Sequence, residues 1–289
     1  MNELARDVTL LAIPNVSEGR DQTAIDAIAD AFDARLLDVH SDTDHHRSVF
    51  TLAGEPGELA QVVVNGAAEA IRQVDLDAHE GIHPRVGAID VAPIVYLDRA
   101  DRGAACAEAL VLGDLLGEEL ELPVFLYGEL AQGRTRAELR KGGPATLAKR
   151  IDSGELKPDF GPHKLHPTAG AVLVAARPPL VAFNVELAPP ATLDDARAIA
   201  AAIREGGPEG LHSVRAIGLW LAARDVAQVS TNVEDHRATS LARVVAAIAR
   251  HATPSQAELV GLAPRAAFDG FPDDLPVANR RVVEDALTE

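Results

Sequence analysis

One order of predicted elements occurs twice along the chain, before and after the Arg177-Pro178-Pro179 segment. Each half begins with an apolar run typical of a strand and continues as helix, strand, strand, helix and strand. This order is typical of an α+β sheet of the ferredoxin-like type. The second half repeats the first loosely, without visible sequence identity. We therefore predict an α+β fold in two parts, with a boundary near Pro178.

The spacing of apolar residues predicts the individual elements. In the first half we expect strands over residues 8–13, 36–39, 48–53, 86–95, 123–127 and 169–176, and helices over residues 21–32, 57–71 and 100–120. Residues 130–158 are predicted to be helical and basic, and residues 160–168 to form a loop rich in Gly, Pro and His. In the second half we expect strands over residues 180–187, 214–221, 226–231 and 258–262, and helices over residues 193–205 and 239–251.

Composition predicts a protein of the cytoplasm. Cys106 is the only cysteine among 289 residues, so an internal disulfide is impossible, as is usual in a reducing compartment. The N-terminus lacks the basic and then apolar pattern of a signal peptide. No apolar run reaches the length that spans a membrane, so we expect no membrane association.

The distribution of charge favours a small anionic ligand. The formal net charge of −17 argues against nucleic-acid binding, which needs clustered Lys and Arg. Residues 134–164, however, hold eight basic and four acidic side chains, a local excess of four positive charges. Such an excess attracts anionic small molecules. An ordinary solvated helix face is the alternative interpretation.

The segment His79-Glu80-Gly81-Ile82-His83 fits the motif of zinc hydrolases, in which two histidines one helical turn apart bind zinc. That mechanism requires a helix. Gly81 weakens a helix by about 1 kcal/mol relative to Ala, and Pro84 disfavours helical backbone at His83. We therefore expect no metal here and keep a zinc hydrolase as a remote alternative.

A second group of histidines and carboxylates follows the predicted strand at 36–39. Its members are His40, Asp42, Asp44, His45 and His46. Three interpretations are open: a polar active-site loop, a solvated turn of Asp and Ser, or a metal site. We favour the active-site loop.

Many short segments, in one order and along nearly the whole chain, resemble the formiminotransferase domain family. They include Ile13-Pro14-Asn15-Val16-Ser17-Glu18-Gly19-Arg20, Leu36-Leu37-Asp38-Val39, Arg47-Ser48-Val49-Phe50-Thr51, His83-Pro84-Arg85-Val86-Gly87-Ala88-Ile89-Asp90, Pro158-Asp159-Phe160-Gly161-Pro162, His166-Pro167-Thr168-Ala169-Gly170, Ala182-Phe183-Asn184-Val185, Ala227-Gln228-Val229-Ser230-Thr231-Asn232 and Glu258-Leu259-Val260-Gly261-Leu262. Some family members carry a fused cyclodeaminase domain, which we expect to be absent here.

The resemblance implies a fold, a reaction and a set of residues. The fold would be two ferredoxin-like subdomains, residues 1–178 and 179–289, with a substrate groove between them, in a homodimer. The enzyme would be a glutamate formimidoyltransferase of histidine degradation and one-carbon metabolism. It would move a formimino group from N-formimino-L-glutamate to N5 of tetrahydrofolate, its co-substrate. The catalytic residue of the family falls on His83, which we expect to be the general base.

The family's folate-binding loop falls on ten consecutive residues: Gly161, Pro162, His163, Lys164, Leu165, His166, Pro167, Thr168, Ala169 and Gly170. The glycines would let the backbone approach a flat pterin ring, and the basic residues before the loop would meet the folate's glutamate carboxylates. Candidate supporting residues are Asp38, His40, His46, Arg47, Arg85 and Asp90.

Four residues near the expected active site differ from those usual in the family. His40 stands where Asp is common, His46 where Asn is common, Glu80 where Lys is usual and Ile82 where Glu is usual. A related enzyme acting on 5-formyltetrahydrofolate is therefore a second expectation. A folate-binding protein without catalysis is a remoter one.

Overall fold

The computed structural model describes residues 8–76, 79 and 84–289. By its contacts the chain divides into two compact units, Met1–Pro178 and Pro179–Glu289, and each is an α+β structure built around its own sheet. No helix in the described part of the chain is long and apolar enough to cross a membrane.

The sheet of the first unit has the ferredoxin-like strand order with two strands added. Its strands are β1 (Leu10–Ala12), β2 (Asn15–Val16), β3 (Arg35–Asp42), β4 (Arg47–Gly54), β5 (Ile89–Tyr96), β6 (Val124–Leu126) and β7 (Val172–Arg177). Across the sheet β3 pairs with β4, both β1 and β2 lie between β4 and β5, and β7 and β6 follow. The pairs β5–β7 and β6–β7 are parallel, and the others are antiparallel.

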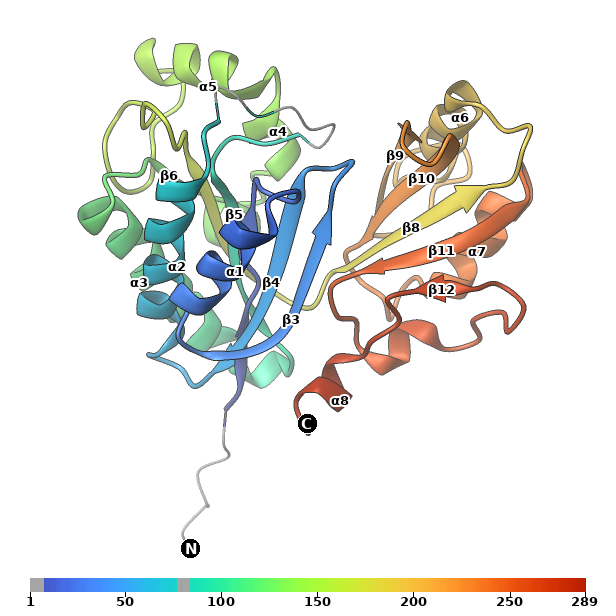
Figure 1. Cartoon of the computed structure of the whole chain (residues 1–289), viewed down its shortest axis with the longest axis horizontal. Coiled ribbons are helices and arrows are strands. Elements are labelled where there is room, and N and C mark those ends of the chain that lie inside the picture. The colour runs from blue at the N-terminus through green and yellow to red at the C-terminus, as the bar shows by residue number, and fades with distance from the viewer. Residues whose placement is uncertain (1–7, 77–78, 80–83) are drawn as a thin grey trace, which may run out of the picture. The chain divides into compact units, whose positions relative to one another are not determined.

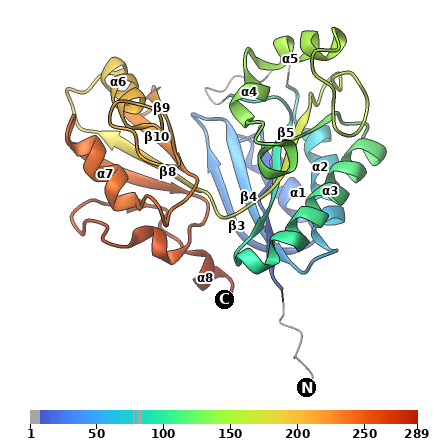
Figure 2. The same ribbon diagram turned by 180° about the vertical axis from the view of Figure 1, so that it is seen from behind.

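Helices cover the two faces of this sheet unequally. The larger core packs α1 (Gln22–Ala31), α2 (Leu59–Gln73) and α3 (Arg102–Glu119) against one face. A smaller core packs the short α4 (Arg136–Arg140) and α5 (Gly143–Asp152) against β5, β6 and β7 on the other face. Figures 1 and 2 show α4 and α5 apart from the three longer helices. The second face is therefore left partly without helices.

Local signals explain where several helices begin. The Asp21 side chain accepts hydrogen bonds from the amides of Thr23 and Ala24 and so caps α1. Thr135 and Glu138 form a capping box at the start of α4. Residues 130–158, predicted to be helical, form two short helices and not one. A 3₁₀ turn, Gly128–Ala131, comes first, and Gly142, with φ of 77°, separates α4 from α5.

The second unit repeats the same arrangement. Its elements are β8 (Val181–Leu187), α6 (Leu193–Ile203), β9 (Val214–Leu221), β10 (Val226–Val233), α7 (Leu241–Ala249), β11 (Pro254–Val260), β12 (Val277–Ala278) and α8 (Val283–Ala286). The strand order is β12-β11-β8-β10-β9, in which the last four positions match β5, β1, β4 and β3 of the first unit. The predicted α+β fold with two ferredoxin-like sheets is therefore confirmed. The substrate groove expected between the subdomains stays a prediction.

Candidate active site

One face of the first sheet carries polar side chains where β3 and β4 pair. Asp38, His40 and Asp42 alternate along β3, so their side chains point to the same face. Across the ladder Asp42 lies opposite Arg47 of β4, which therefore shares this face. Because Phe50 of β4 belongs to the core under α1 and α2, the polar residues occupy the other face, which those helices leave uncovered.

His40 is the most buried member of this group, with 8% of its surface exposed. Its Nε2 atom has no hydrogen-bond partner among the described residues. Burial lowers the pKa of His40 below the ordinary 6.5, although the nearby Asp38 and Asp42 carboxylates act in the opposite direction. The ring is therefore mainly neutral at pH 7, with a buried nitrogen whose hydrogen-bonding capacity is unused among the described residues.

Asp90 is a buried carboxylate at a β-bulge. Asn15 pairs with Val91 and Val16 pairs with Ile89, so Asp90 is the extra residue between them. Its side chain is ion-paired with Arg140 of α4 and is 1% exposed. Its second oxygen accepts the backbone N–H of Val86 at 2.8 Å. Asp90 thus joins the sheet, α4 and the segment that follows Pro84-Arg85.

Arg47 lies in the same region of the sheet face. Burial lowers the pKa of Arg47 to about 10, and the positive charges of Arg140 and Arg136 act in the same direction, whereas the carboxylates of Asp90 and Asp42 raise it. A guanidinium remains fully charged at pH 7 even so. The electrostatic consequence is a concentration of positive charge where β4, β5 and α4 meet.

His46 occupies the turn between β3 and β4. Its φ of 50° lies in the left-handed region, which Asn tolerates better than most residues. The backbone N–H of Gly19 donates to His46 Nδ1 at 3.2 Å, and Glu18 Oε1 lies 3.4 Å from the same nitrogen. The same Gly19 N–H also donates to Glu18 Oε1 at 2.8 Å, so the three groups together hold the ring of His46 in place.

His79 meets this hairpin from another part of the chain. Its ring is stacked on His46, and its Nε2 lies 3.0 Å from the carbonyl oxygen of His46. Arg85 donates to the carbonyl oxygen of His79. Burial lowers the pKa of His79, and the charge of Arg85 acts in the same direction. His79 is not in a helix, and Nε2 is already engaged. The zinc-hydrolase arrangement required a helical His79.

The loop of residues 161–170 is attached to the segment after Arg85 by backbone hydrogen bonds. Ala88 donates to Ala169 at 2.9 Å, and Ala171 donates to Val86 at 3.0 Å. Gly170, with φ of 71°, forms a bridge with Gly87 at this junction. Proline, histidine, lysine and threonine side chains at 162–168 remain half-buried or exposed.

The glycines at the two ends of this loop are required by the packing of the chain itself. A Cβ added at Gly161 would lie 2.1 Å from the Leu122 carbonyl oxygen, and one at Gly170 would lie 2.2 Å from that of Val86. Both residues also have positive φ, which favours glycine. Their close backbone approach is therefore to the protein itself, a reason different from the pterin contact expected from the sequence.

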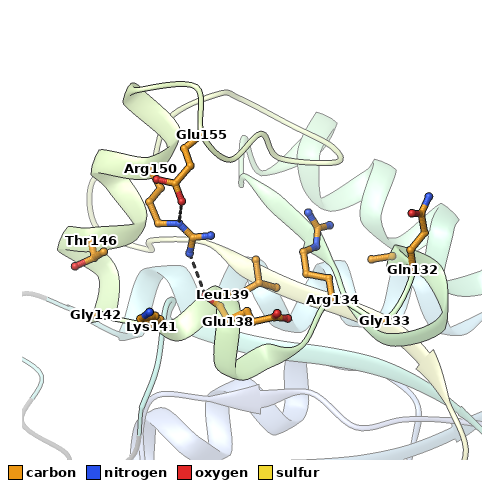
Figure 3. Close-up of a pocket in the computed structure, with 11 residues that line it drawn as sticks. Gln132, Gly133, Arg134, Glu138, Leu139, Lys141, Gly142, Thr146, Arg150 and Glu155 are labelled. Atoms are coloured by element: carbon orange, nitrogen blue, oxygen red, sulfur yellow. Dashed lines mark hydrogen bonds and ion pairs between the residues drawn. The ribbon is translucent and has the colours of Figure 1, made fainter.

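A cavity of about 930 Å³ opens on the side of α4 and α5 (Figure 3). Arg134 in its wall is ion-paired with Asp159, which precedes the loop. Arg150 is bonded to Glu155 and to the carbonyl oxygen of Glu138. Lys141 has no ion-pair partner in the described part of the chain. The cavity thus offers one uncommitted cation beside two arginines held by acids.

Within the residues that the structure describes, no three or more His, Cys, Asp or Glu side chains are grouped so as to hold a metal ion. In the histidine-rich hairpin, Asp42 is engaged with His45, whose Nδ1 lies 3.0 Å away. The polar turn is therefore organised by internal hydrogen bonds, and part of it faces the sheet surface described above.

Comparison with known proteins identifies the family. The model of the formiminotransferase domain, N-terminal subdomain, matches residues 9–177, and that of the formiminotransferase domain matches residues 182–269. The chain belongs to the formiminotransferase domain family. It is 36% identical to the glutamate formimidoyltransferase of Streptococcus pyogenes serotype M1, over 89% of each chain. The corresponding protein of Thermoplasma acidophilum is 35% identical, with 89% of this chain and 88% of that protein covered.

Other members of the formiminotransferase family are longer. The formimidoyltransferase-cyclodeaminase of Sus scrofa is 38% identical over 271 residues, which are 87% of this chain and 49% of that protein. The chain therefore spans about half the length of these relatives.

The candidate supporting residues lie in two groups in the described structure. Asp38, His40, Arg47 and Asp90 share one face of the first sheet. The other two candidate supporting residues, His46 and Arg85, both contact His79. His83, Glu80 and Ile82 lie outside the described residues, so the role of His83 stays a prediction.

Sequence reasoning did not single out three residues that lie at or near the candidate site. Arg140 appeared only as one of eight basic residues, and its pairing with Asp90 joins positions 50 residues apart. Glu18, beside His46, and Tyr127, beneath Arg136, were not singled out either. The available signal was the excess of basic residues over 134–164, which indicated a cationic site without showing which residue faces it.

Proposed function

We propose that this protein transfers the formimino group of N-formimino-L-glutamate to N5 of tetrahydrofolate, with His83 as general base. The observation that carries the proposal is similarity to two glutamate formimidoyltransferases along almost their whole lengths. The polar sheet face and the attached loop support it, because the family's catalytic segment and folate loop meet through backbone hydrogen bonds at 86–88 and 169–171.

The reaction needs one proton transfer at each end. The lone pair of folate N5 attacks the amidine carbon of the donor, and a C–N5 bond forms. The bond between that carbon and the glutamate nitrogen then breaks. His83 accepts the N5 proton and returns a proton to the departing amino group, so atoms and charge balance. A histidine suits this exchange because its ordinary pKa lies near neutrality.

Described residues have supporting roles in this scheme. Asp90 fixes the backbone at Val86, three residues after His83 in the sequence, and the ion pair with Arg140 holds Asp90 in place. The neutral His40 lies on the same sheet face, with a buried Nε2 that has no partner among the described residues. Residues 161–170 bind the folate, and the cavity beside α4 and α5 receives its glutamate carboxylates at Lys141. In this proposal the enzyme acts in the cytoplasm as a homodimer and belongs to histidine degradation.

The assay uses purified protein, N-formimino-L-glutamate and tetrahydrofolate, with glutamate and 5-formiminotetrahydrofolate identified by mass spectrometry. Release of glutamate only when tetrahydrofolate is present supports the proposal. Tight folate binding without glutamate release contradicts this choice of donor. A parallel reaction of 5-formyltetrahydrofolate with glutamate tests the alternative enzyme, which acts on this folate. That alternative is motivated by His40 and His46, which stand where Asp and Asn are common in the family. If neither reaction proceeds although the folate binds, a folate-binding protein without catalysis becomes the better description.

A further inference from the structure

Three arginines gather around two carboxylates at the junction of β4, β5 and α4. Arg47 begins β4, and Arg136 and Arg140 lie one helical turn apart on α4, so they share a side of that helix. The charges that act on Arg47 are those of Arg140, Asp90, Arg136 and Asp42. The Asp38 carboxylate lies on the same sheet face, and Arg136 is the guanidinium of this group without an ion pair in the described part of the chain.

Two hydrogen-bond donors at this cluster have no acceptor among the described residues. The Nε atom of Arg140 is buried and unpartnered, although another nitrogen of the same guanidinium binds Asp90. Tyr127, 6% exposed, has an unpartnered hydroxyl, and the Arg136 guanidinium lies 5.7 Å from the centre of its ring. A buried donor without an acceptor is unfavourable, and an anion with several oxygens would satisfy both the donors and the charge.

We propose that Arg47, Arg136 and Arg140 form a subsite for a carboxylate of the amino-acid donor. This inference rests on the proposed function and assigns residues to the recognition of the donor. The guanidinium fork binds a carboxylate through two parallel hydrogen bonds, a geometry that a lysine cannot reproduce.

Both substrates carry carboxylates, and position favours the donor. Asp90, the partner of Arg140, holds the backbone of Val86 close to the predicted catalytic residue. In N-formimino-L-glutamate the reacting carbon is joined through one nitrogen to the carbon that carries the α-carboxylate. In tetrahydrofolate the carboxylates lie at the far end of the p-aminobenzoyl-glutamate tail, away from N5. A carboxylate subsite beside the catalytic segment therefore fits the donor.

Conservative substitutions test the subsite. Arg140→Lys and Arg47→Lys keep the charge and remove the fork. We expect the KM for N-formimino-L-glutamate to rise about tenfold to a hundredfold, as for the loss of a charged hydrogen bond, while the KM for tetrahydrofolate changes less than about twofold. Arg136→Gln, at a residue with no ion pair in the described part of the chain, is a third variant that leaves the Asp90–Arg140 pair intact.

Arg102→Lys is the matched control. Arg102 is also ion-paired with a carboxylate, that of Glu129, but lies on α3 with half of its side chain exposed. We expect both KM values to stay unchanged. Circular dichroism and the melting temperature establish that each variant is folded.

A binding measurement separates this inference from the proposed reaction. N-acetyl-L-glutamate carries both donor carboxylates and no transferable formimino group. Calorimetry should detect its binding to the wild-type protein and about tenfold weaker binding to Arg140→Lys and Arg136→Gln, even if no turnover is found. Equal binding to all folded variants, no binding to the wild-type protein, or a rise confined to the KM for tetrahydrofolate would overturn the donor subsite.

Discussion

The ring of His46 lies stacked on the ring of His79, with centroids 4.1 Å apart and an interplanar angle of 27°. One histidine comes from the β3–β4 turn and the other from a segment 33 residues later, just before the predicted catalytic residue. Burial lowers the pKa of both, and the effect of His79 on His46 is in the same direction. The stacked pair is therefore compatible with two neutral rings and disfavours their protonation.

This pair predicts a loss of stability in mild acid. Because the folded pKa values lie below the ordinary 6.5, the unfolded chain binds more protons between those values and 6.5. The free energy of unfolding therefore falls as the pH drops below 6.5. His46→Asn, which suits the φ of 50°, should reduce the drop in melting temperature between about pH 7 and pH 5. His212→Asn, at a histidine whose side chain is 71% exposed, is the control. An identical drop in wild type and His46→Asn would contradict the prediction.

Replacing His83 tests the catalytic assignment. We expect His83→Ala to lower kcat by about 10²–10⁴-fold, the usual range for loss of a general base, with tetrahydrofolate binding retained. The comparison variant is His79→Ala, which removes the stacked ring without removing the predicted base. If His83→Ala leaves the turnover rate unchanged, another group performs the proton transfer.

Metal analysis tests the remaining zinc hypothesis. His79 uses Nε2 against the carbonyl oxygen of His46, so we expect no stoichiometric zinc in untreated protein and no loss of activity after chelation. Elemental analysis of wild type and His79→Ala provides the measurement. Zinc at one equivalent in wild type, lost in His79→Ala, would restore the zinc hydrolase as the better assignment.

The buried ion pair between Asp90 and Arg140 predicts that replacing Asp90 lowers the free energy of unfolding strongly. Asp90→Ala leaves Arg140 without its carboxylate and removes the acceptor for the Val86 amide. Breaking one partner of a buried pair lowers the free energy of unfolding by about 3–5 kcal/mol. Urea unfolding measures this change. Asp285→Ala, in an exposed pair with Arg265, should cost about 1 kcal/mol or less. Equal effects of the two substitutions would show that Asp90 is not structurally important.

Gly170 and Gly154 have nearly the same φ, so a comparison of their alanine variants distinguishes the effect of backbone strain from that of close packing. Gly170 has φ of 71° and Gly154 has φ of 74°, but only at Gly170 would a Cβ meet neighbouring atoms. Both alanine variants carry the strain of positive φ, about 1–3 kcal/mol. Gly170→Ala should in addition displace the 86–88 junction and weaken binding of tetrahydrofolate. Calorimetric affinities that are equal in the two variants would argue against a role of this junction in folate binding.

The order of elements was predictable from sequence, and the contacts between distant segments were not. Helix α1 was evident from the spacing of its apolar residues and from Asp21, its cap. The predicted strand over 36–39 was too short, because polar Ser41 and Asp42 continue β3 through pairing with β4. That pairing sets which side chains share the polar face. It depends on register across the sheet, which no local pattern in the sequence encodes.

The candidate site residues also divide into those that the sequence predicts and those that depend on contacts between distant segments. The sequence predicts Asp38, Arg47 and Asp90 as candidates because they lie in segments that resemble the family, and His40 because it follows one of these segments. It does not predict Arg140, because the role of Arg140 depends on the β-bulge that turns Asp90 toward α4. A bulge adds one residue to a strand and leaves little trace in the alternation of polar and apolar residues.

The backbone bonds from Ala88 to Ala169 and from Ala171 to Val86 have a kinetic consequence. They join the proposed folate loop to residues 86–88, which follow the predicted catalytic residue His83 in the sequence. A ligand that restrains residues 161–170 therefore also restrains residues 86–88. Amide exchange at Ala88 and Ala171 should then slow together when tetrahydrofolate binds, and the enzyme should follow a compulsory order in which the folate enters first.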